Sequence, residues 1–176
     1  MIFALIAVVV LAMLFLWRLA RGQGEPIGTI QDLEGRLVQV DLAAFRNLID
    51  PSQDEFLRGR LSPGEFRSLK RKRCRAALDY VSGTSHNAAL LLRLGEAARR
   101  SPDVTVAAAG EQLVNAALST RIYSLMAISE LYLEVLLPGF SFPVSNVADR
   151  YERLRDSLGR LGYLQQPAAA RVYHAV

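Results

Sequence analysis

Few residues of this chain have catalytic potential: one cysteine, Cys74, and two histidines, His86 and His174. A nucleophilic cysteine needs a histidine within hydrogen-bond reach. Cys74 and His86 are twelve positions apart, roughly 18 Å along an unbroken helix, so only a break near Gly83 would bring them together. The sequence therefore predicts a protein that is not an enzyme, and a hydrolase with an unrecognised site is only a third hypothesis.

The acidic residues form no recognised metal motif. Glu130 and Glu134 lie one helical turn apart in the most apolar part of the chain. Di-metal carboxylate bundles need Glu-x-x-His partners, and neither histidine has a glutamate three residues before it. We expect the two glutamates to pair with Arg121 or with an arginine of the last helix, and we expect no metal ion and no cofactor.

One run of basic residues is a candidate binding surface, here called the basic cluster: Arg67, Lys70, Arg71, Lys72, Arg73 and Arg75. Residues 63–100 contain nine Lys or Arg and three acids, whereas the flanking parts each contain six and seven. Charges at consecutive positions point around a helix, so they cannot all be buried. The cluster is interpreted as a solvated face, a site for anionic headgroups, a site for an acidic protein, or a site for nucleic acid. Nucleic acid is disfavoured because no aromatic residue interleaves the charges.

The most apolar stretch is residues 1–20, with no charged side chain from Met1 to Trp17. As a helix it would be roughly 30 Å long, which matches the hydrocarbon core of a bilayer. A cleaved secretory signal and a buried core helix are the alternatives, but the basic n-region and the small-residue cleavage site of a signal are missing. We expect a transmembrane anchor.

The orientation of this anchor follows from the basic residues beside it. Arg18, Arg21 and Arg36 follow the stretch and no basic side chain precedes it. The positive-inside rule then places the N-terminus outside and the bulk of the chain in the cytoplasm. A single cysteine agrees with a reducing compartment, because it cannot form an internal disulfide.

The remainder is long enough for one domain. We expect a juxtamembrane linker at 21–29, a helical bundle at 30–164 and a flexible tail at 165–176. A helix is expected at about 41–49, and three more begin where a capping side chain precedes proline, at Asp50-Pro51, Ser62-Pro63 and Ser101-Pro102. Ser145 is expected to cap the last helix. The predicted fold is all-α: one transmembrane helix followed by a four- to five-helix bundle.

Two of these helices have informative patterns. The helix from residue 102 to about 137 is apolar on most sides, which is typical of the central, buried helix of a bundle. The last helix has an apolar stripe with four-three spacing, which is interpreted either as core or as a surface for a partner helix. The stripe consists of Val147, Tyr151, Leu154, Leu158 and Leu161.

Together these features predict a membrane-anchored helical scaffold or interaction protein, a subunit of a larger membrane-associated assembly. Its expected partners are the membrane, which residues 1–20 would span and whose anionic headgroups are one of the candidate ligands of the basic cluster, and a protein or a second copy of the chain. The alternative is a membrane-tethered regulator that binds nucleic acid through the basic cluster.

Overall fold

The computed structural model describes residues 27, 29–33, 35–136 and 146–165. These ranges contain five α-helices, one short 3₁₀ helix and no strand, which confirms the predicted helical bundle. The elements are η1 (Ile30–Leu33), α2 (Leu42–Ile49), α3 (Pro51–Arg58), α4 (Pro63–Ala98), α5 (Val104–Leu136) and α6 (Asn146–Gln165).

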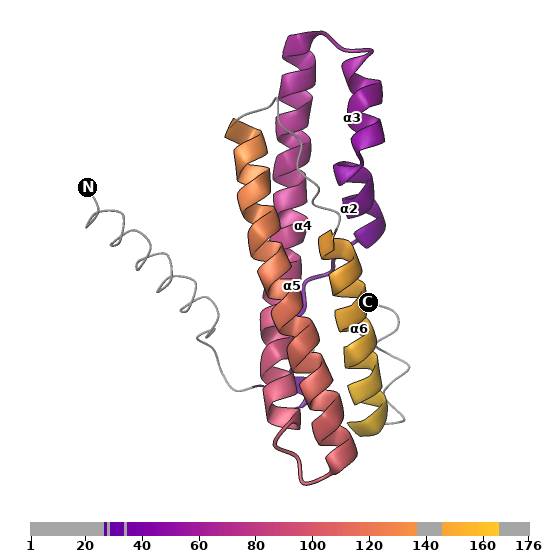
Figure 1. Ribbon diagram of the computed structural model, residues 1–176, viewed down its shortest axis with the longest axis vertical. Coiled ribbons are helices and arrows are strands. Elements are labelled where there is room, and N and C mark those ends of the chain that lie inside the picture. Colours follow the sequence, from indigo (N-terminus) through magenta and orange to yellow (C-terminus); the bar gives the residue numbers. More distant parts are fainter. Residues whose placement is uncertain (1–26, 28, 34, 137–145, 166–176) are drawn as a thin grey trace, which may run out of the picture.

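Two long helices, α4 and α5, form an antiparallel hairpin that organises the domain (Figure 1). With 36 and 33 residues, they are roughly 54 and 50 Å long. Helix α6 packs along α5 and also touches α4, while α2 and α3 lie beside the first half of α4. The core lies between α4, α5 and α6, which contribute the fully buried Leu94, Leu113 and Leu154, respectively.

A close approach of α4 and α5 near their connection requires glycine. A Cβ atom added to Gly110 would lie 2.6 Å from the backbone nitrogen of Arg99, and one added to Gly95 would lie 3.0 Å from the Gly110 carbonyl oxygen. Both distances are shorter than van der Waals contact, so any side chain at Gly110 would push the helices apart.

Two of the predicted helix starts are confirmed. Asp50 caps α3 by accepting a hydrogen bond from the Ser52 amide. Ser62 and Glu65 form a complete capping box at the start of α4, which satisfies amides that the first helical turn leaves without partners.

The predicted start at Ser101-Pro102 is wrong by two residues, because α5 begins at Val104. Asp103 takes the capping role, and its Oδ1 accepts hydrogen bonds from the amides of Thr105 and Val106. Asp103 is as good a capping residue as serine, and a sequence that offers both side by side does not say which one the backbone selects.

The break near Gly83 that would have been needed to bring Cys74 and His86 together is absent, since α4 runs unbroken from Pro63 to Ala98. Val38 and Val40 cross the helix at this point, each with a methyl carbon 3.4 Å from where a Cβ of Gly83 would lie. The glycine thus gives the crossing segment room on the helix surface. One turn further on, Asn87 holds this segment by accepting from the Val38 amide and donating to the Val38 carbonyl.

Helix α5 is not buried on all sides, contrary to the expectation of a central helix. It packs on α4 and α6, but its outer face presents large apolar side chains to solvent. These are Leu118, Ile122, Met126, Tyr132, Leu133 and Leu136, between 41% and 72% exposed.

Among the described residues, no helix is both long and apolar enough to cross a membrane. The predicted anchor at 1–20 and the expected cap Ser145 lie outside the described residues, as do most of the linker and of the tail.

Candidate anion-binding surface on α4

The structure divides the basic cluster between two sides of the first half of α4. Four of its members are exposed and surround a hollow of about 530 Å³ that Gly64 and Ser68 also line. These four, here called the basic face, are Arg67, Arg71, Lys72 and Arg75. Because Arg67, Arg71 and Arg75 are spaced four residues apart, they follow one another along the same side of the helix.

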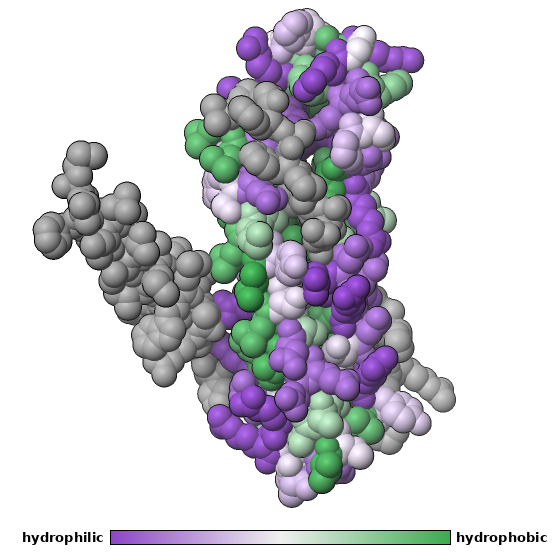
Figure 2. Space-filling model, viewed as in Figure 1, coloured by the Kyte–Doolittle hydropathy of each residue, from purple (hydrophilic) through white to green (hydrophobic). Residues whose placement is uncertain are grey.

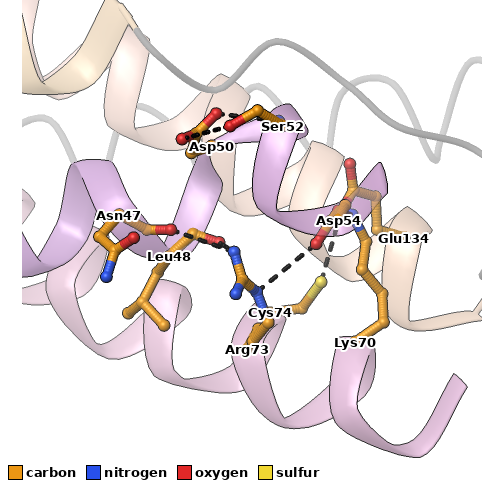
Figure 3. Close-up of polar contacts among 9 residues, drawn as sticks. All are labelled: Asn47, Leu48, Asp50, Ser52, Asp54, Lys70, Arg73, Cys74 and Glu134. Carbon is orange, nitrogen blue, oxygen red and sulfur yellow. Dashed lines mark hydrogen bonds and ion pairs between the residues drawn. The ribbon is translucent and has the colours of Figure 1, made fainter. Parts of the chain in front are cut away.

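Lys70, in contrast, points into the protein and is 8% exposed. Its Nζ donates to the carboxylate of Asp54 from α3 and lies 3.3 Å from Oε2 of Glu134 on α5 (Figure 3). Burial opposes the charge of Lys70, but the hydrogen bond to Asp54 and the negative charge of Glu134 outweigh it, and the pKa of Lys70 is raised. The residue therefore joins three helices as a buried cation.

Arg73 also faces inward and secures the junction between α2 and α3. Its Nη2 donates to the carbonyl oxygens of Asn47 and Leu48 at 3.0 and 2.9 Å, and its Nε lies 3.5 Å from Oδ1 of Asp54 (Figure 3). The carbonyls at a helix end lack intrahelical partners, so the guanidinium satisfies groups that α2 leaves open.

These inward charges matter because α3 has no buried residue. A helix without an apolar anchor depends on polar contacts for its position. Besides Asp54, the contacts include Arg58, whose guanidinium lies 5.1 Å from the centre of the Phe66 ring on α4. Lys70 and Arg73 are therefore structural, and only the other four cations of the cluster face solvent.

Cys74 is buried beside this ion pair and its thiol donates to Glu134 at 3.3 Å (Figure 3). Burial, followed by the hydrogen bond to Glu134, raises the pKa of the thiol to about 12. Since the thiolate is the nucleophile, a thiol in this environment is unreactive at neutral pH. His86 is exposed on the same unbroken helix, so it does not activate Cys74.

The partner of Glu134 is one that the sequence did not suggest. Arg121 and the arginines of α6 were the expected partners, whereas Lys70, 64 positions away in the chain, makes the ion pair.

Burial and the neighbouring charge of Glu134 raise the pKa of Glu130. In the described ranges no group of three His, Cys, Asp or Glu residues is placed to hold a metal ion.

The apolar stripe of α6 lies in the core of the domain. Val147, Leu154 and Leu161 are at most 2% exposed, and Tyr151 and Leu158 are 7% and 8% exposed. The hydroxyl of Tyr151 accepts a hydrogen bond from Asn87 of α4 at 2.6 Å, so its polar tip is satisfied within the domain. In this structure the stripe packs on α4 and α5 and leaves no surface for another helix.

A second hollow, of about 780 Å³, lies between the beginning of α5 and the end of α6. Ala108, Ala109 and Tyr163 contribute apolar surface, and Asp156 and Arg160 contribute one charge of each sign. Unlike the basic face, this hollow has no excess of positive charge and is not an anion site.

Comparison with known proteins gives no further guide to this site, because no family model, no curated protein and no solved structure matches the chain.

Proposed function

We propose that this protein is a membrane-anchored helical interaction protein whose basic face on α4 binds anionic headgroups at the cytoplasmic surface. The observation that carries the proposal is the division of the basic cluster, which leaves four cations around one exposed hollow. Two further cations of the same run are engaged in structural ion pairs. The exposed charge is therefore concentrated on one side of the helix.

Headgroups are favoured over other anions because the apolar stretch 1–20 would hold the domain close to a bilayer. A basic residue near an anionic membrane contributes about 1 kcal/mol, roughly a fivefold change in binding per residue. Four such residues could change the preference for an anionic surface by two orders of magnitude or more. In this role the domain would serve as a scaffold or as a subunit of a larger membrane-associated assembly.

The full chain, reconstituted into vesicles, provides the test. A donor dye is attached to Ser68→Cys, beside the hollow, in a Cys74→Ala background, and the acceptor is a headgroup-labelled lipid. We expect more energy transfer with phosphatidylserine than with phosphatidylcholine alone. The difference should disappear at about 1 M salt, where the Debye length is about 3 Å.

A matched pair of variants separates the basic face from overall charge. The test variant changes Arg67, Arg71, Lys72 and Arg75 to glutamine. The control changes four exposed arginines elsewhere to glutamine and alters the net charge equally: Arg99, Arg100, Arg153 and Arg160. Loss of the lipid-dependent transfer in the test variant alone supports the proposal, and equal loss in both variants contradicts it.

The anchor itself is tested independently by Leu11→Asp in residues 1–20. A charge at the centre of a membrane helix costs about 3 kcal/mol on insertion. We expect wild-type protein to stay with membranes after alkaline extraction and the variant to be released. Release of both would remove the anchor from the proposal.

Partners are identified by cross-linking the full chain in its native membrane and analysing what co-purifies. A stoichiometric protein would support the subunit role, whereas lipid alone would favour the headgroup role. Nucleic acid would use the same four cations, so steeply salt-dependent binding of the full chain to duplex DNA or RNA would replace headgroups as the partner.

A further inference from the structure

The outer face of α5 has an apolar seam without a partner among the described helices. Its positions, here called the outer seam, are Leu118, Ile122, Leu125, Ser129, Tyr132 and Leu136. The steps between them alternate between four and three residues over almost three heptads, the spacing of a coiled-coil interface. Figure 2 shows apolar side chains along the left-hand edge of the domain, where α5 runs.

The seam is exposed as well as regular. Ile122 and Tyr132 are each 57% exposed, and Leu136 is 72% exposed. Met126 and Leu133, each one position beyond a seam residue, are 52% and 45% exposed and widen the strip. Contiguous apolar surface of this extent on a folded domain indicates an interaction site.

The one polar residue of the seam does not prevent a dry contact. The hydroxyl of Ser129 donates to the carbonyl oxygens of Met126 and Leu125, at 2.7 and 3.2 Å. Because its hydrogen is used within the helix, Ser129 can be covered without leaving a donor unsatisfied.

We infer that the outer seam pairs with the same seam of a second copy of this chain. Large side chains have on the order of 150–200 Å² of surface each. The six large apolar side chains on the outer face of α5 are about half exposed, so they leave on the order of 500 Å² of apolar surface bare on each copy. They are Leu118, Ile122, Met126, Tyr132, Leu133 and Leu136. Two copies would then bury about 1,000 Å², the lower bound for a specific interface. A helix with the same heptad spacing offers knobs that fit the holes of this one.

The charges beside the seam favour a helix over a lipid surface as its occupant. Helices that lie on membranes have Lys and Arg along the flanks of their apolar face. On α5 the only basic residue is Arg121, which is 8% exposed, while Glu111 and Glu130 are acidic. The outer seam lies on α5 and the basic face on α4, so failure of headgroup binding would not contradict the pairing, and failure of the pairing would not contradict headgroup binding.

The experiment compares two matched variants of the full chain in neutral detergent, by light scattering over a range of protein concentrations. Ile122→Glu places a charge in the seam, and Phe56→Glu makes the same kind of change on α3, where the side chain is 53% exposed. We expect wild type and Phe56→Glu to form dimers. Ile122→Glu should weaken dimerisation by at least about 30-fold, as expected for a central interface residue.

The occupant is identified by a photo-cross-linker at position 126 in a mixture of isotope-labelled and unlabelled protein. Cross-links between labelled and unlabelled α5 peptides support the pairing. A monomeric wild type, a dimer that Ile122→Glu leaves intact, or cross-links only to lipid or to residues 1–20 would each overturn it. Circular dichroism of Ile122→Glu confirms that a loss of dimer is not a loss of fold.

Discussion

The buried position of Lys70 makes a quantitative prediction about stability. Replacing Lys70 with methionine keeps the aliphatic stem but removes the charge that faces Asp54 and Glu134. Leaving one member of a buried pair without its partner costs about 3–5 kcal/mol. In the variant, Glu134, which is 4% exposed, would lose the charge of Lys70, whereas Asp54 would keep Arg73 at 3.5 Å. We therefore expect the free energy of unfolding to fall by about 3 kcal/mol, near the lower end of this range.

The measurement is urea unfolding of the full chain in neutral detergent, followed by the loss of helical circular dichroism. In a thermal melt of the same variant, a loss of about 3 kcal/mol in the free energy of unfolding corresponds to a decrease of roughly 10 °C in Tm for a domain of this size. Lys72→Met is the matched control, because Lys72 is exposed two residues further along the same helix. We expect its effect to stay within about 0.5 kcal/mol.

A second substitution tests the cause of the loss. Glu134→Gln removes the carboxylate charge and keeps an oxygen that can accept from the Cys74 thiol. If the cost of Lys70→Met comes from an uncompensated Glu134, the double variant should recover about 1–3 kcal/mol relative to the sum of the single changes. Additive effects, or equal losses in Lys70→Met and Lys72→Met, would refute the reasoning.

The pH dependence has a definite sign. The pKa of Lys70 is raised in the folded protein, so its contribution is fully present below the unfolded pKa of about 10.4. It is lost as pH rises further, through the folded pKa. The stability of wild type should therefore fall more steeply than that of Lys70→Met above about pH 10.4, and parallel curves would contradict the assignment.

Three further predictions concern the rest of the domain. Gly110→Ala should destabilise the domain by about 1 kcal/mol or more. Gly159→Ala, where no atom lies within 4 Å of the added methyl group, should leave the domain unchanged or stabilise it by up to about 1 kcal/mol. Thermal melts of both variants check this. Asn87→Leu should lower the free energy of unfolding in urea by about 1–3 kcal/mol, because it removes the hydrogen bonds of Asn87 with the Val38 amide and carbonyl and with the Tyr151 hydroxyl; a loss below about 1 kcal/mol would contradict this role of Asn87. Cys74 should react with a maleimide orders of magnitude more slowly in the folded protein than in urea, since its pKa is about 12 and it is buried; similar rates in both states would contradict its burial.

Local features of the fold were predictable from the sequence because their causes are local. The starts of α3 and α4 depend on side chains within three residues of the helix end, Asp50 and the Ser62–Glu65 capping box. The unbroken course of α4 through Gly83 was not predictable, because the segment that crosses there comes from residues 38–40, more than forty positions away.

The candidate site was predictable in composition but not in geometry. A run of basic residues on a helix must spread around it, but which members face inward depends on where Asp54 and Glu134 lie. The exposure of α5 was mispredicted for a related reason. A helix that is apolar on most sides is ordinarily covered on all of them, and the described part of this chain has no helix on the outer seam.

The division of the basic cluster changes how its function has to be tested. Neutralising Lys70, Arg71, Lys72 and Arg73 together would remove two exposed cations and two structural ones, so a loss of binding could follow from displacement of α3 alone. Helix α3 has no buried residue, and Lys70 and Arg73 both pair with its Asp54. Substitution confined to the basic face removes exposed charge and leaves these pairs intact. Loss of headgroup binding with unchanged stability would then be a property of the surface, whereas the same loss with a lowered Tm would show that the two sides of α4 are not independent.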